Sequence, residues 1–245
     1  MQFTAGGPTF FNCVAVSQTN DPTGSWFRYA ISTGANFPDY PKAAVWPDAY
    51  YLSTREFLGS TFKGVGAYAL NRAQALAGDP NAQVISFLAP PAPLYAVGDG
   101  LLPSDWDGPT PPPAGSPNYY LGSQDNGAGY GAPTDALNLY KFHVDFANPP
   151  ASSFGLTNTI PVAAFNSILG ICGGTDGRDC IPQPNTTVKI DHLGYRQRPT
   201  FRLAYRNFGD HESLVTNQSV SAGMARMAKC QAFAGGNCVV QIAVR

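Results

Sequence analysis

The sequence predicts an all-β protein in which several antiparallel sheets of three or four strands are arranged like the blades of a β-propeller. Glycine and proline, with 26 and 22 residues of 245, make up about a fifth of the chain and leave little room for long helices. Hydrophobic residues account for 44%, enough for a sizeable core. Apolar or alternating segments recur between turn residues along most of the chain. A β-sandwich is the alternative architecture.

The first strands are predicted in the N-terminal third of the chain. Residues 10–17 are apolar and β-branched, and residues 25–31 alternate as a half-buried strand does. Residues 21–24, with the sequence DPTG, form a turn signal, because proline presets φ and glycine permits positive φ. Further strands are expected at residues 43–46, 49–55, 65–71 and 84–88, with a helical turn at residues 72–76.

A weak internal repeat supports the propeller. The segment YYLS at residues 50–53 resembles YYLG at residues 119–122, and each is followed by a glycine-rich turn, a second strand and an outer apolar run. Repeated units of this kind, tens of residues long, are typical of propellers. We predict one domain over residues 1–245, with units at about 9–91, 101–166 and 182–220 and no assignment for 221–245. The later strands are expected at residues 137–144, 160–165, 200–206 and 213–220.

The stretch 101–115 holds five prolines. Because proline donates no ladder hydrogen bond, this stretch is not expected to form a central strand. We interpret it as an extended connection between blades.

Composition excludes several classes of function. The net charge is −1 and charged residues make up only 13%, so no concentrated basic face is expected for nucleic acid or an anionic membrane. No apolar stretch approaches the roughly 20 residues of a membrane span. The sequence also lacks a nucleophile elbow, a phosphate-binding loop and a zincin motif.

The cysteines indicate an oxidising compartment. Cys172 and Cys180 flank a flexible loop and are predicted to form a disulfide, with reduced thiols or a metal site as alternatives; zinc lacks the usual ligand spacing. Cys230 and Cys238 have the same spacing and form a second candidate pair. Cys13 is then left over, which suggests a partner outside this chain. The scarcity of charge also favours secretion. Because the sequence begins without a signal peptide, either the protein is cytosolic or its natural N-terminus is missing, and the odd Cys13 and the abrupt start favour the second interpretation.

Several motifs occur together in a fixed order. They are CVAVS and DPTGSW at residues 13–26, DYPK and VWPDAYY at 39–51, DWDGP at 105–109, FHVD at 142–145, CIPQP at 180–184 and YRNFGDHE at 205–212. Together they resemble a family of large secreted bacterial β-propeller proteins of unassigned function, over residues 8–220. Members carry a signal peptide and about two further blades before the first of these strands, so this chain looks like an N-terminally truncated, incomplete propeller.

Two segments depart from the family pattern. Residues 195–199 read YRQRP where the family has Asp-Arg followed by apolar residues, and residues 224–230 do not match its closing strand. A propeller that lacks blades exposes strand edges and apolar faces, so self-association through blade edges is expected.

A pair of carboxylates facing a central funnel would indicate a glycosidase. Asp39 and Asp48 flank a predicted inner strand, and Glu212 is a third candidate; Asp191 and Asp210 are also available. The competing interpretation is that the aspartates cap turns.

The densest polar cluster comprises Arg206, Asn207, Asp210 and His211, next to Glu212. It is a candidate binding site for an anion or a sugar, in which His211 would titrate near neutral pH. The alternative is a polar turn between two strands, with Asn207 and Gly209 in left-handed conformations.

No metal site or cofactor is predicted. The segment DWDG at residues 105–108 resembles part of a calcium loop but lacks the further oxygen ligands at fixed spacing. Trp26, Trp46 and the tyrosine pairs are candidates for stacking on sugar rings, whereas core burial is the expectation for Tyr51 and Trp46. His143 is expected to be exposed on a strand, and His192 has no obvious partner.

The sequence thus favours an extracellular, non-catalytic module that binds a polysaccharide or a protein. The alternative is a glycoside hydrolase-like enzyme with a carboxylate pair in the funnel.

Overall fold

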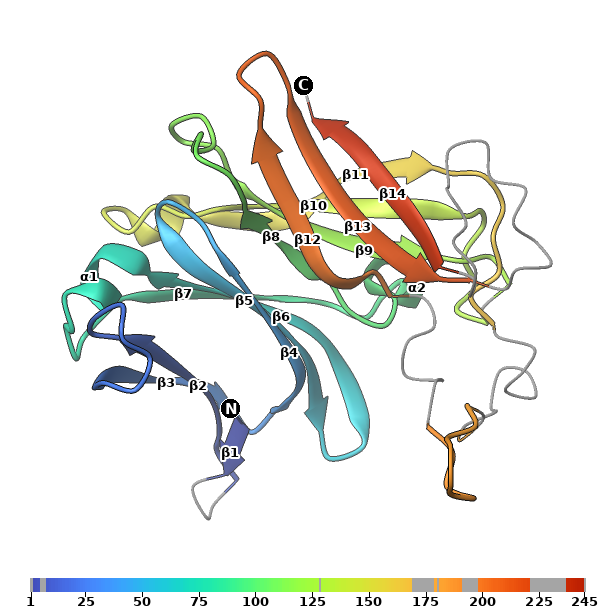
Figure 1. The fold of residues 1–245 in the computed structure, drawn as a ribbon, viewed down its shortest axis with the longest axis horizontal. Helices are drawn as coiled ribbons and strands as arrows, with labels where there is room; N and C mark the ends of the chain where they lie inside the picture. Colours follow the sequence, from blue (N-terminus) through green and yellow to red (C-terminus); the bar gives the residue numbers. More distant parts are fainter. Residues whose placement is uncertain are drawn as a thin grey trace.

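The computed structural model describes residues 2–4, 8–127, 129–168, 179, 181–190, 198–220 and 237–244. The described residues form three sheets and very little helix, so the prediction of an all-β protein with several antiparallel sheets is confirmed (Figure 1). Within the described residues the sheets do not close into a ring.

The first sheet has the order β1-β2-β3 and comprises β1 (Gln2–Thr4), β2 (Phe10–Ser17) and β3 (Trp26–Gly34). The predicted turn joins β2 to β3, and the carboxylate of Asp21 accepts a hydrogen bond from the backbone N–H of Thr23 at 2.9 Å. This is the Asx turn that the sequence DPTG favours.

The second sheet is a four-stranded antiparallel meander, β4-β5-β6-β7. Its strands are β4 (Phe37–Val45), β5 (Ala49–Leu58), β6 (Thr61–Asn71) and β7 (Val84–Ala89). The predicted helical turn is present as α1 (Arg72–Leu76), and the side chain of Asn71 caps it by accepting from the backbone N–H of Gln74 at 3.1 Å. The first predicted unit, residues 9–91, therefore spans two sheets.

The third sheet is seven-stranded, with the order β11-β10-β9-β8-β12-β13-β14. One half is an antiparallel meander of β8 (Leu102–Trp106), β9 (Asn118–Gln124), β10 (Ala136–His143) and β11 (Ser153–Pro161). The other half comprises β12 (Thr200–Asn207), β13 (Glu212–Ser219) and β14 (Asn237–Val244). The short helices α2 (Leu94–Val97) and η1 (Pro149–Ala151) lie in connections.

The prediction that residues 101–115 contain no central strand was wrong. Strand β8 lies in the middle of the seven-stranded sheet and includes Pro103. It pairs with β9 through Leu102 and Pro103 and, in parallel, with β12 from Ser104 onward. Pro103 therefore stands where β8 changes partner, which limits the effect of its missing N–H.

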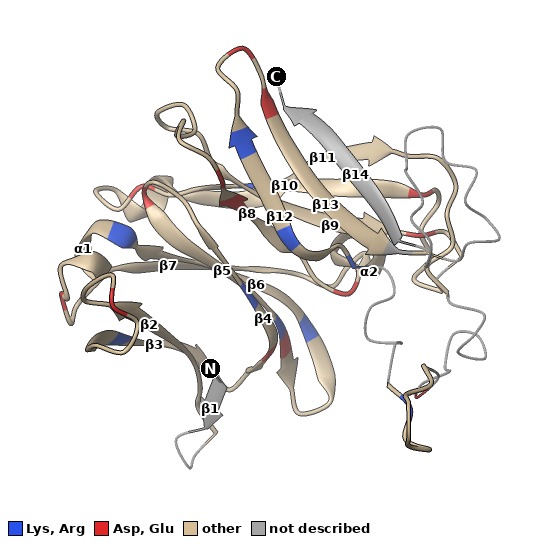
Figure 2. Ribbon diagram, viewed as in Figure 1, with Lys and Arg blue, Asp and Glu red and all other residues tan. Residues whose placement is uncertain are grey.

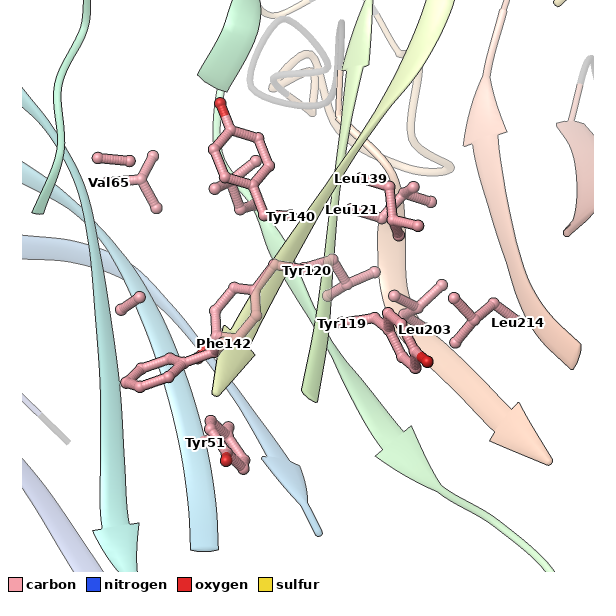
Figure 3. Packing of buried hydrophobic residues seen from close by; sticks show 14 of the residues in the cluster. Tyr51, Val65, Tyr119, Tyr120, Leu121, Leu139, Tyr140, Phe142, Leu203 and Leu214 are labelled. Carbon is pink, nitrogen blue, oxygen red and sulfur yellow. The ribbon is translucent and has the colours of Figure 1, made fainter. Parts of the chain in front are cut away.

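The predicted repeat corresponds to a structural one. Tyr51 lies on β5 and Tyr120 on β9, each the second strand of a four-stranded meander. Both side chains are fully buried, and their rings meet edge to face with centroids 6.4 Å apart (Figure 3). The Tyr120 hydroxyl donates to the carbonyl oxygen of Leu52 at 3.0 Å, so it also links the two sheets. Tyr51 and Trp46 are core residues, as the alternation predicted, and Tyr119 and Tyr120 are buried too, whereas Tyr50 is partly exposed.

A second core cluster holds the first sheet against the second. Val16 and Ile31 are buried against Leu52 and Leu70, on the face of the second sheet opposite the main core. The Tyr29 hydroxyl donates to the carbonyl oxygen of Ala75 in α1 at 2.8 Å.

The first strands of three successive antiparallel groups, β4–β7, β8–β11 and β12–β14, lie together. Strand β4 packs against β8, and β8 pairs in parallel with β12. The segments that enter β8 and β12 therefore lie close to β4. Gly100 before β8 and Pro199 before β12 line the same pocket as Tyr40 on β4.

Some predictions lie outside the described residues. Cys172, Cys180, Cys230, Asp191 and His192 are not described, and only the backbone of Cys238 is, in β14. Cys13 lies half-buried on β2. Among the described helices, none has the length and apolar character needed to cross a membrane.

Candidate basic pocket

A small pocket lies where β4 and β5 meet the start of β8 and the segment that enters β12. Its volume is about 20 Å³, room for roughly one water-sized group. Three basic side chains reach it from different parts of the chain. Figure 2 shows charged residues to be sparse over the ribbon, with basic segments close together around the labels β4 and β6. The lining residues are Tyr40, Lys42, Ser53, Thr54, Arg55, Asp99, Gly100, Leu101, Leu102, Arg198 and Pro199.

A β-bulge in β4 builds one wall. Asp39 faces Arg55 and Lys42 faces Ser53, so Tyr40 and Pro41 together oppose Thr54. Tyr40 has a φ of 56°, in the left-handed region that non-glycine residues seldom adopt. Bulges redirect side chains, and this one directs Tyr40 and Lys42 into the same pocket.

The Tyr40 ring carries two of the cations. The Nζ of Lys42 lies 3.3 Å from the ring centroid, and the guanidinium carbon of Arg198 lies 4.3 Å from it. Both are cation–π contacts, which stabilise a cation more when water is excluded.

These cations are costly to hold together. Burial, followed by repulsion from Arg198, lowers the pKa of Lys42 to about 8, and Asp39 opposes the shift. Burial also lowers the pKa of Arg198, with Asp99 opposing and Arg55 reinforcing the shift. Arg198 is only 8% exposed, and its buried Nε makes no hydrogen bond in the described part of the chain.

The acidic residues compensate this charge incompletely. Nη2 of Arg55 lies 3.5 Å from Oδ1 of Asp99, and Nη1 lies 3.7 Å from Oδ2 of Asp39. Both distances exceed the roughly 2.7–2.9 Å of a charge-assisted hydrogen bond. Oδ1 of Asp99 accepts a shorter bond, 2.7 Å, from the Tyr130 hydroxyl. Lys42, Arg55 and Arg198 thus face only two carboxylates. Of these, Asp99 is buried and Asp39 is partly exposed at the rim of the pocket.

The predicted carboxylate pair is not brought together. Asp39 lies opposite Arg55, whereas Asp48 lies at the far end of β4, next to Ala49. Arg55 and Ala49 are six positions apart on β5, so about 20 Å separates the two aspartates. Glycosidases need their carboxyl groups roughly 5–10 Å apart. Glu212 lies on β13, in another sheet.

Asp48 is exposed at the turn between β4 and β5. Loss of hydration raises the pKa of Asp48. The shift is opposed by hydrogen bonds from the backbone N–H groups of Asp48 and Ala49 and from the Tyr51 hydroxyl, and by the charge of His143. These backbone contacts are those of a turn-capping aspartate. His143 is exposed at the end of β10, as expected.

Glu212 lies beside two buried tyrosines. Burial raises the pKa of Tyr119 to about 12, and the charge of Glu212 adds to the shift. The pKa of Tyr205 rises for the same two reasons.

The predicted polar cluster forms the exposed tip of the β12–β13 hairpin. The Asn207 side chain donates to the carbonyl oxygen of Pro111 at 2.8 Å and accepts from the N–H of Gly209 at 2.8 Å. Asp210 and His211 pair at 2.7 Å, and His211 stacks on Phe208. Gly209 has a positive φ, whereas Asn207 does not, so that part of the prediction was wrong. Arg206 contacts the Phe208 ring with its guanidinium.

The calcium-like segment is already paired with a cation. Nε of Arg202 lies 2.8 Å from Oδ2 of Asp105, and its Nη2 lies 3.5 Å from Oδ2 of Asp107. Among the residues that the structure describes, no three His, Cys, Asp or Glu side chains form a metal-binding group.

Buried carboxylates elsewhere are satisfied by hydrogen bonds. Glu56 accepts from Asn36 at 2.9 Å and from the Tyr68 hydroxyl. Asp125 accepts from the backbone N–H and the hydroxyl of Ser167, each at 2.6 Å. These carboxylates hold strands and loops in place.

The sequence did not reveal the basic pocket. The motif DYPK contains Asp39, Tyr40 and Lys42, but nothing in it indicates a bulge. Arg198 is far away in sequence and follows a segment without recognisable pattern. Only the fold brings them together.

No protein-family model matches the chain, and comparisons with curated proteins and with solved structures gave no significant match.

Proposed function

We propose that this chain is a non-catalytic binding module of a secreted bacterial propeller protein, and that it recognises an anionic polysaccharide or protein outside the cell. The observation that carries the proposal is the convergence of Lys42, Arg55 and Arg198 on one small pocket.

The position of the pocket supports binding. It lies at one end of the contact between β4 and β8, the opening strands of two units, beside the segment that enters β12. In a propeller the opening strands surround the central channel, whose mouth is accessible to ligands. An anion held there would contact residues of several units at once.

The arrangement of carboxylates favours binding over hydrolysis. The separation of Asp39 from Asp48 is about twice what an inverting glycosidase uses. The acidic residues at the pocket, Asp39 and Asp99, are both directed at Arg55.

A direct test is to apply the full chain to an array of acidic and neutral glycans and immobilised acidic proteins, and to assay the same glycans for hydrolysis. We expect retention of acidic ligands without turnover. Turnover that is abolished by Asp48→Asn would replace the proposal with the glycosidase alternative, and retention of no ligand would refute it.

A further inference from the structure

We infer that the basic pocket is a receptor for a single carboxylate group of a uronic acid-containing polysaccharide, an inference that rests on the proposed binding function and specifies its ligand. Lys42, Arg55 and Arg198 supply the cationic contacts.

The first argument is the uncompensated charge. Arg198 is buried, carries a charge that no accessible pH removes, and leaves its Nε without a hydrogen bond in the described residues. Nε of Arg55 is likewise buried and without a partner there. A hydrogen bond with Tyr40 and the charge of Asp99 offset the charge of Arg198 only in part, so a bound anion would lower the cost of burying the two guanidinium groups.

The second argument is geometry. Both arginines present planar forks, which match a planar carboxylate by paired N–H···O bonds, while Lys42 supplies a point charge. The volume of about 20 Å³ admits one small group and leaves the remainder of the ligand outside.

The third argument is that aromatic rings lie next to the basic pocket. The guanidinium of Arg55 lies 5.0 Å from the ring centroid of Phe57 and 5.4 Å from that of Phe62. Both rings are partly exposed, so apolar ring faces adjoin the charge. A sugar ring presents C–H groups on one face, which suit such a platform. An acidic protein would instead require an extended basic surface, and only 15 residues of the chain are Lys or Arg.

Carboxylate binding should be linked to protonation of Lys42. The charged groups that face its amine are Arg198, Arg55, Asp39 and Asp99, with the Tyr40 ring beneath it. In the free protein the pKa of Lys42 is about 8, and a bound anion would raise it. Binding should therefore take up protons near pH 8 and weaken as the pH rises from 7 to 9.

The test is calorimetric titration of the full chain with a tetrasaccharide of galacturonic acid, its methyl ester, sodium sulfate, sodium phosphate and a glutamate-rich peptide. We expect the acid to bind and its ester to bind at least about tenfold more weakly, because a charged hydrogen bond contributes about 1.5–3 kcal/mol. Arg198→Gln and Lys42→Met should each weaken binding about tenfold or more. Arg28→Gln, which removes an exposed charge on β3, should not.

The outcomes separate this inference from the proposed function. Equal binding of acid and ester, or no effect of Lys42→Met, would overturn the carboxylate receptor while leaving a binding module. Tighter binding of sulfate, phosphate or the peptide would overturn the uronate assignment. If Arg198→Gln fails to fold, proton uptake on ligand binding at pH 8 still tests the carboxylate receptor. This uptake should be present in the wild type and absent in Lys42→Met. If no ligand of the array binds, the proposed function itself fails.

Discussion

At the scale of single residues, Lys42 shows how the fold changes the chemistry of a side chain. Its neighbours on β4 and β5 remove water from the amine, and Arg198 adds repulsion. The result is an amine that titrates near pH 8 rather than above pH 10. Nothing in the sequence around Lys42 indicates this, because the decisive neighbour lies on a distant segment.

The lowered pKa of Lys42 predicts a pH dependence of stability. The amine of Lys42 binds its proton more tightly in the unfolded chain than in the folded protein. The cost of holding a charged Lys42 in the folded protein is therefore fully present below about pH 8. It is relieved as the pH rises from there toward the pKa of Lys42 in the unfolded chain. Chemical denaturation from pH 7 to 9.5 should therefore show the wild type gaining stability relative to Lys42→Met. A constant difference between the two proteins would contradict the assignment.

Tyr120→Phe tests the polar link between the sheets. The substitution leaves the ring packing intact but removes the hydroxyl that donates to the carbonyl oxygen of Leu52. A buried hydrogen bond contributes about 0.5–1.5 kcal/mol, so the free energy of unfolding should fall by that amount. Tyr50→Phe, at a partly exposed position one residue from Tyr51, should change stability much less in the same urea titration.

At the scale of elements, alternation in the sequence predicted the strands well. The similar apolar segments around Tyr51 and Tyr120 located β5 and β9, which are buried over most of their length, and the turn at residues 21–24 located the β2–β3 hairpin. One strand was misplaced, since β11 spans Ser153–Pro161 where a strand was predicted at residues 160–165. The other failures occur at prolines. Strand β4 contains Pro38 and Pro41 and begins six residues before the predicted strand, and β8 contains Pro103. Each irregular position depends on which neighbour the strand pairs with, and local sequence does not specify that.

Gly64 in β6 is an element-scale test of packing. It has a φ of 130°, and a Cβ there would collide with the carbonyl oxygen of Ala89 on β7. Gly64→Ala should lower the free energy of unfolding by about 2–3 kcal/mol or more, since it combines backbone strain with a clash. Gly59→Ala is the control, because Gly59 also has positive φ but its Cβ would meet nothing within 4 Å. A loss no greater than that of the control would contradict the packing described for β6 and β7.

At the scale of the whole molecule, two strands at the edges of the described sheets carry exposed apolar residues. Strands β7 and β11 are the outer strands of their meanders and contact each other, and Val84, Leu88 and Leu156 on them are exposed. Unpaired edges with apolar side chains favour strand pairing between molecules. We therefore predict self-association through these edges.

Sedimentation velocity from about 1 to 100 µM checks this prediction, since association through edges depends on concentration. The double variant Leu88→Lys and Leu156→Lys should shift the protein toward the monomer, because lysine on an edge opposes pairing. Leu58→Lys is the matched control, as Leu58 is equally exposed at the β5–β6 hairpin. A monomeric wild type over the whole range would refute the prediction.

The parallel pairing of β8 with β12 also constrains how the chain assembles. Ser104 pairs with Leu203, so this ladder joins segments roughly a hundred residues apart, whereas β8 and β9 are near neighbours along the chain. Contacts of such long range form late, after the local hairpins have offset the entropy of closing the intervening loop. During synthesis β8 would emerge long before its second partner, and its edge would stay open until β12 arrives.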